Sequence, residues 1–143
     1  MTGMNDILTP MTHAAQNRCF GCGQANPTGL QLEFFLAEDK SVVCFCSMPA
    51  TFEGPPGYLH GGIIATLLDE TMSKAVRAQG LTAMTRKLDV EYLRPVPSCA
   101  HLRMEGHVTR SEGRKHWTEA RILNANGSLL AHAEGLFIEV HAH

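Results

Sequence analysis

The sequence predicts an α+β fold in which one antiparallel sheet wraps around a single long helix. Apolar residues recur at helical spacing over one long stretch, residues 61–77. The segments before and after it alternate apolar with polar residues, as strands do. A lone helix cannot bury its own apolar stripe, and an antiparallel sheet needs a cover on one face. Packing the sheet around the helix satisfies both.

Size and composition indicate one compact unit of ordinary globular character. The 143 residues are 44% hydrophobic and 18% charged, which suits a single domain. We divide the chain into an N-terminal arm, 1–18, and a domain, 19–143. A net charge of −2 argues against nucleic acid or an anionic membrane as partner. Neither a membrane-length apolar run nor a signal peptide is recognisable, so we predict a cytoplasmic protein.

The elements before the helix are short. We expect residues 1–18 to be irregular or partly helical. The sequence NPTG at 26–29 is typical of a turn. Strands are predicted over 30–36 and 41–48, and the loop over 49–58 is rich in proline and glycine.

The helix stripe ends near Arg77, and Gly80 stands where a C-terminal cap glycine is expected. Four further strands are then predicted over 87–92, 101–108, 115–123 and 129–140, with turns at 112–113 and 126–127. In the last of them Ala131, Ala133 and Gly135 share one face, so the helix can lie close to the sheet.

The entry to the helix is unusual because His60 is followed by Gly61 and Gly62. Each glycine costs about 1 kcal/mol relative to alanine inside a helix. The amides of a first helical turn have no intrahelical partner, and together with the helix dipole they can stabilise an oxygen that gains negative charge. Two interpretations stay open from the residues alone: an oxyanion site, or a tight corner between loop and helix.

Asp69 falls on the helix face opposite the apolar stripe. That face also carries Gly62, Ala65, Thr66 and Ser73, which are small and mildly polar rather than charged. Such a face suits close contact with a ligand or a second subunit, whereas Glu70 points further round, toward solvent or a salt bridge. Whether Asp69 is catalytic or interfacial stays open at this point.

The five cysteines do not suggest a disulfide framework. Cys19 and Cys22 have zinc-ligand spacing, but a closed structural site needs four ligands and no second pair follows. His13 could supply a third. We therefore predict no metal and interpret the pair as buried or turn-forming. Redox chemistry is less favoured still, since no βαβ pattern surrounds the two residues.

The sequence also resembles a known family. Residues 59–70, LHGGIIATLLDE, are similar to the helix signature of PaaI-type hot-dog thioesterases. The similarity continues in MT at 84–85 and VEYLRPV at 90–96, and upstream in CFGCG at 19–23 and NPTGL at 26–30. The matching segments lie within residues 19–140.

The resemblance implies a hot-dog fold and hydrolysis of an acyl-CoA thioester to a free acid and CoA. It implies active sites at the interface of a homodimer whose sheets join edge to edge, often paired into a tetramer. The Gly62 N–H would polarise the thioester carbonyl, with His60 helping to shape that turn and Gly61 contributing to substrate binding. Asp69 of the partner subunit would be general base or nucleophile. Thr85 would position the water or the carboxylate.

CoA is then part of the substrate, and no cofactor is expected. Its phosphates need cations, and the best-placed ones in the sequence are Arg94, Arg110, Arg114 and Lys115. A plain solvated hairpin explains the last three equally well. Candidates to line an acyl pocket are Phe52, Tyr58, Met72 and Met84.

Two alternative functions share this fold. One is hydration or dehydration of an acyl thioester, although those enzymes generally pair aspartate and histidine differently. The other is acyl-CoA binding without catalysis.

Overall fold

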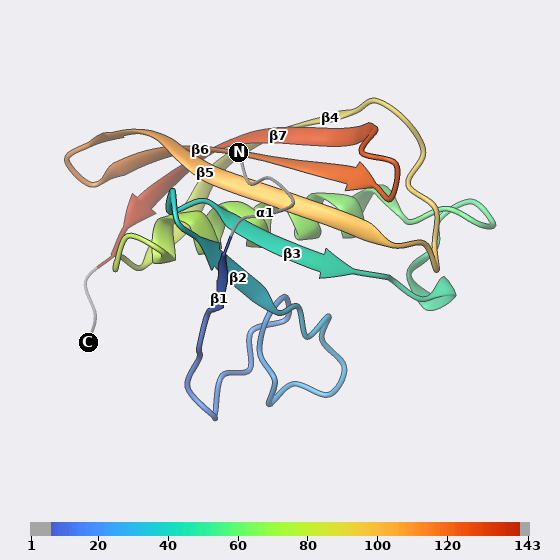
Figure 1. The fold of residues 1–143 in the computed structure, drawn as a ribbon, viewed down its shortest axis with the longest axis horizontal. Helices are drawn as coiled ribbons and strands as arrows, with labels where there is room; N and C mark the ends of the chain where they lie inside the picture. The colour runs from blue at the N-terminus through green and yellow to red at the C-terminus, as the bar shows by residue number, and fades with distance from the viewer. Residues whose placement is uncertain (1–6, 141–143) are drawn as a thin grey trace.

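The computed structural model describes residues 7–140 as one sheet with one long helix (Figure 1). Residues 1–6 of the predicted arm and 141–143 of the predicted domain lie outside the described residues. The elements in chain order are β1 (Leu8–Pro10), β2 (Phe34–Ala37), β3 (Val42–Cys46), a 3-10 turn (Ala50–Phe52), α1 (Gly61–Arg77), β4 (Ala83–Tyr92), β5 (Leu102–Glu112), β6 (Lys115–Asn124) and β7 (Leu129–Glu139).

The strands form one antiparallel sheet in the order β1-β2-β3-β5-β6-β7-β4. The strands curve around α1, which lies across one face of the sheet (Figure 1). The predicted α+β architecture is therefore confirmed. Although β4 follows α1 in the sequence, it lies at the far edge beside β7, and within residues 7–140 no strand pairs with its outer side.

The apolar stripe of α1 is the centre of the core. Leu67, Leu68 and Met72 have no exposed surface, and each such burial contributes about 1.5–3 kcal/mol relative to an exposed side chain. They pack with residues of β2, β3, β5, β6 and β7. This burial, rather than helix propensity, holds a helix that begins with two glycines.

Small residues let the helix approach the sheet. A Cβ on Gly106 would lie 2.8 Å from the Thr71 Cγ2, and one on Gly135 would lie 3.1 Å from the Met72 Sδ. The prediction that small residues in β7 allow close packing is thus confirmed. Met72 is fully buried between helix and sheet. It therefore cannot line an open acyl pocket, and its prediction as a pocket residue is wrong.

The N-terminal part differs from the prediction. Residues 8–10, expected to be irregular or helical, form a strand that pairs with β2. The strand predicted over 30–36 begins only at Phe34. The reason is that the Leu30 and Leu32 N–H groups donate to the Phe20 and Gly21 carbonyls, at 2.7 and 2.9 Å. Residues 30–33 therefore pair with the loop that holds the two cysteines.

No helix within residues 7–140 combines the length and apolar character needed to cross a membrane.

Candidate functional site

The start of α1 presents one unpartnered amide. His60 is the N-cap, and its Nδ1 accepts a hydrogen bond of 2.8 Å from the Gly62 N–H. The His60 carbonyl accepts from Ile63 and Ile64. Among the described residues the Gly61 N–H has no hydrogen-bond partner, and Gly61 is exposed. The amide that is free to meet a ligand is thus that of Gly61, one residue before the amide expected from the resemblance.

Strand β4 braces this helix start. The Tyr92 hydroxyl donates a 2.9 Å hydrogen bond to the Gly61 carbonyl. Tyr92 is half exposed, at 51%, although its ring crosses from the sheet edge to the helix. Sequence reasoning missed this contact, because the strand period only places Tyr92 among the alternating residues.

Asp69 is half-buried and fixed by one short hydrogen bond. The Thr85 hydroxyl of β4 donates to the Asp69 Oδ1 at 2.6 Å, so the structure brings these two predicted residues together. Burial raises the pKa of Asp69, the hydrogen bond from Thr85 lowers it, and the negative charge of Glu70 raises it again, with a net rise. A carboxylate with a raised pKa is a stronger base once ionised.

Asp69 and the free amide lie apart on the same helix. Asp69 lies eight positions after Gly61, which corresponds to about 12 Å along the helix at 1.5 Å per residue. A carbonyl bound at the Gly61 amide is therefore out of reach of the Asp69 of the same chain, since reacting atoms must come within about 3–3.5 Å.

The predicted basic residues lie at opposite ends of β4. Arg94 follows the end of the strand and is exposed. Arg110, Arg114 and Lys115 belong to the β5–β6 hairpin, whose Arg114 donates to the Glu139 carbonyl at 2.8 and 3.1 Å. Glu139 pairs with Ala83, the first residue of β4. A strand of ten residues separates the two groups by about 30 Å, so one chain does not bring them together.

The hairpin arginines are also partly engaged. The Arg110 guanidinium stacks on the Trp117 ring, 3.8 Å from its centroid, and lies 3.8 Å from the Glu112 carboxylate. Stacking fixes its plane while leaving most of its donors exposed.

The cysteine pair lies against the helix. Cys19 and Cys22 are free thiols, and the Cys19 Sγ lies 3.7 Å from both carboxylate oxygens of Glu70. Glu70 also pairs with Lys74 at 3.8 Å, and its side chain is only 12% exposed. The salt bridge predicted for Glu70 is confirmed, but its alternative placement in solvent is wrong.

The comparisons with known proteins identify the family. Residues 56–131 match the family model of the thioesterase superfamily, more than half of the chain. This protein belongs to the thioesterase superfamily. An acyl-coenzyme A thioesterase of Xenopus laevis, THEM4, is 33% identical over 75% of this chain and 49% of its own length. The chain thus spans about half the length of this curated relative.

Solved structures of similar proteins agree with the fold. The superfamily protein RHA08564 is 31% identical with a TM-score of 0.80, covering 87% of this chain and 60% of the other. A Bacillus halodurans protein solved with CoA is 26% identical with a TM-score of 0.69, covering 79% and 76%. The E. coli PaaI protein is 19% identical with a TM-score of 0.73, covering 79% and 82%. The predicted hot-dog fold is therefore confirmed.

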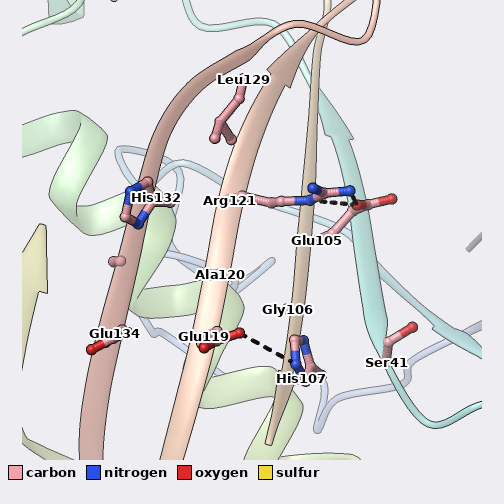
Figure 2. Close-up of a pocket in the computed structure, with 11 residues that line it drawn as sticks. Ser41, Glu105, Gly106, His107, Glu119, Ala120, Arg121, Leu129, His132 and Glu134 are labelled. Carbon is pink, nitrogen blue, oxygen red and sulfur yellow. Dashed lines mark hydrogen bonds and ion pairs between the residues drawn. The ribbon is translucent and has the colours of Figure 1, made fainter. Parts of the chain in front are cut away.

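One cavity lies away from the helix start. A cavity of about 330 Å³ lies over β5, β6 and β7 on the sheet face away from α1 (Figure 2). It is lined by Ser41, Gly106, Ala120, Ala133, Leu129 and the polar side chains Glu105, His107, Glu119, Arg121, His132 and Glu134. Glu105 accepts from Arg121 at 2.9 and 3.0 Å. No predicted site residue lines this cavity, whereas the predicted residues Asp69 and Thr85 meet between α1 and β4.

The N-cap of α1 gives a first testable prediction. The His60 side chain bonds the Gly62 amide, so His60→Ala should lower the free energy of unfolding by about 1 kcal/mol. His60→Asn should lose only a few tenths of that, because asparagine also caps well. Urea denaturation at neutral pH and one protein concentration measures both. Equal losses in the two variants would mean that the His60–Gly62 bond does not carry the effect.

Proposed function

We propose that this protein hydrolyses acyl-CoA thioesters to a free acid and CoA, at sites that two copies of the chain build together. The proposal rests on two groups of one helix: an unpartnered amide at Gly61 and a half-buried carboxylate at Asp69. They lie about 12 Å apart along the helix. The name of the Xenopus relative and the CoA bound by the Bacillus halodurans protein support the substrate class.

A two-fold pairing of two copies along β4 would bring the Gly61 amide of one copy close to the Asp69 carboxylate of the other. The outer edge of β4 is unpaired within residues 7–140, and it exposes Met84 at 63% along with Tyr92 and, just beyond its end, Leu93. An unpaired, partly apolar edge is suited to strand addition. If β4 pairs with β4 of a second copy in antiparallel fashion, the strand end of each copy lies beside the strand start of the other.

This pairing explains the distribution of residues along the strand. The end of β4 carries Tyr92 and is followed by Arg94. Gly61 of α1 lies beside it, because the Tyr92 hydroxyl donates to the Gly61 carbonyl. The start of β4 carries Thr85, and both Asp69 and the β5–β6 hairpin lie near it. Each of the two symmetric sites then takes the amide and Arg94 from one copy, and the carboxylate and hairpin from the other.

The chemistry needs little more than these groups. The Gly61 amide and the positive end of the α1 dipole stabilise the carbonyl oxygen as it gains charge. Asp69 either takes a proton from the attacking water or attacks the carbonyl carbon itself, and Thr85 holds the carboxylate in place. The C–S bond breaks, the sulfur leaves with a proton as the thiol of CoA, and one water is consumed per ester.

In this proposal Gly62 has a supporting role rather than the direct one expected from the resemblance. Its N–H is engaged by His60, and this bond keeps the His60 ring on the helix end, leaving the preceding amide open. Arg94 of one copy and Arg110, Arg114 and Lys115 of the other are proposed to face the phosphates of CoA.

A thiol-release assay tests the function. The protein is incubated with short, medium, long-chain and aromatic CoA esters, and the free thiol is followed with a chromogenic disulfide. We expect turnover of at least one ester class and no change in the absorbance of an enoyl-CoA. Hydration of the enoyl-CoA without thiol release would favour the hydratase function, and tight ester binding without either reaction would favour a binding protein.

A further inference from the structure

Three side chains of types that bind metals meet where the loop before β2 contacts α1. Cys19, Cys22 and Glu70 each offer a ligand atom, and these atoms all lie within 4.8 Å of one another. The two sulfurs come from the loop before β2, whereas the carboxylate comes from α1, 51 positions further along the chain from Cys19. The sequence could not reveal this third ligand, because only the fold brings Glu70 to the cysteines.

Two glycines of the CFGCG segment make the approach possible. A Cβ on Gly21 would lie 2.6 Å from the Glu70 Oε2, so any other residue would push the carboxylate away. A Cβ on Gly23 would lie 2.4 Å from the Cys19 backbone nitrogen, so the residue directly after Cys22, where the chain turns back onto Cys19, must also be glycine. The loop is therefore shaped to hold both thiols against the carboxylate.

Asn17 orients the two cysteines from outside. Its Oδ1 accepts from the Cys19 N–H at 3.0 Å, and its Nδ2 donates to the Cys22 Sγ at 3.6 Å. Hydrogen bonds from amides to ligand atoms are the usual outer support of metal sites. Asn17 thus helps to hold Cys19 and Cys22 in position.

We propose that Cys19, Cys22 and Glu70 bind one zinc ion. Two thiolates, one carboxylate and distances of this order match zinc, which accepts sulfur and carboxylate ligands together. On binding, each thiol loses its proton to solvent and forms a Zn–S bond. The three ligands carry three negative charges and zinc two positive ones. The Lys74 ammonium, 3.8 Å from the Glu70 Oε1, balances the remaining charge.

The fourth position of the tetrahedron belongs to water. His13, the third ligand considered from the sequence, contacts the cluster through Lys74, whose Nζ lies 3.4 Å from the His13 Nδ1. The ion ties the cysteine loop to α1 and takes no part in ester hydrolysis, so this inference stands independently of the proposed function.

Metal titration of the full chain tests the site. The reduced, chelator-treated protein is titrated with Zn²⁺ against a chromophoric chelator, and with Co²⁺ to record thiolate-to-cobalt charge-transfer bands. We expect one ion per chain, sulfur ligation in the cobalt spectrum, and a higher melting temperature with zinc. Cys19→Ser and Glu70→Gln should each weaken binding by ~10-fold or more.

Cys99→Ser is the matched control, because Cys99 is also an exposed free thiol outside the cluster. It should bind zinc like the wild type. Cys19 is exposed and Glu70→Gln keeps the side-chain shape, so circular dichroism should show both test variants folded. The proposal is overturned if the wild type binds no zinc, if both test variants bind it as tightly as the wild type, or if Cys99→Ser loses binding equally.

Discussion

Replacing Asp69 with asparagine should lower kcat for acyl-CoA hydrolysis by about 10²–10⁴-fold. Asparagine keeps the size of the side chain and can still accept from the Thr85 hydroxyl, which lies 2.6 Å from the Asp69 Oδ1. It can neither take a proton from water nor act as a carboxylate nucleophile. Steady-state thiol release under saturating ester measures the loss. The control is Asp89→Asn, an exposed aspartate of the same strand as Thr85, which should leave kcat unchanged.

The same variant should be at least as stable as the wild type at neutral pH. Because burial raises the pKa of Asp69, the folded state binds the Asp69 proton more tightly than the unfolded chain does. Ionised Asp69 therefore costs stability above the raised pKa, and this cost fades as the pH falls toward the model-peptide value of 3.8. The acid limb of kcat/KM should likewise lie above that value. Wild-type turnover by Asp69→Asn would contradict the assignment.

The sequence predicts the helix and most of the sheet because both follow from the local spacing of apolar residues along the chain. The stripe around Leu67, Leu68 and Met72 is complete within α1, and the turns at Gly113 and Gly127 adopt positive φ as tight turns require. The weak predictions concern short segments. β1 has only three residues, and its pairing with β2 depends on an open sheet edge rather than on its own pattern.

The candidate site divides in the same way. The sequence alone places Gly61 and Asp69 on one helix, and it gives the distance between them along the helix. Which amide is free is not, because it depends on the side-chain rotamer of His60 that engages Gly62. The Tyr92 contact with Gly61 is equally hidden, since a strand and a helix far apart in the chain must meet first.

Removing the free Gly61 amide at the start of α1 should have the second-largest effect on activity. Gly61 is the first residue of α1 after the N-cap, the position where proline is favoured in helices. His60 has φ −62° and ψ 140°, the extended conformation that a residue before proline prefers. Gly61→Pro should therefore fold, keep the carbonyl bonded by Tyr92, and delete only the N–H. We expect kcat to fall by about 10²–10³-fold, the usual effect of losing one oxyanion donor.

Gly61→Ala separates the missing amide from added bulk. A Cβ there would lie 3.7 Å from Tyr92, an ordinary contact, and the N–H remains, so kcat should stay within a few-fold of the wild type. Subunit mixing then tests the shared site. Mixed dimers of Gly61→Pro and Asp69→Asn chains, isolated through two different affinity tags, hold one intact site and one doubly defective site. They should regain about half of the wild-type activity. Mixed dimers no more active than their two parents would mean that the amide and the carboxylate do not come from different copies.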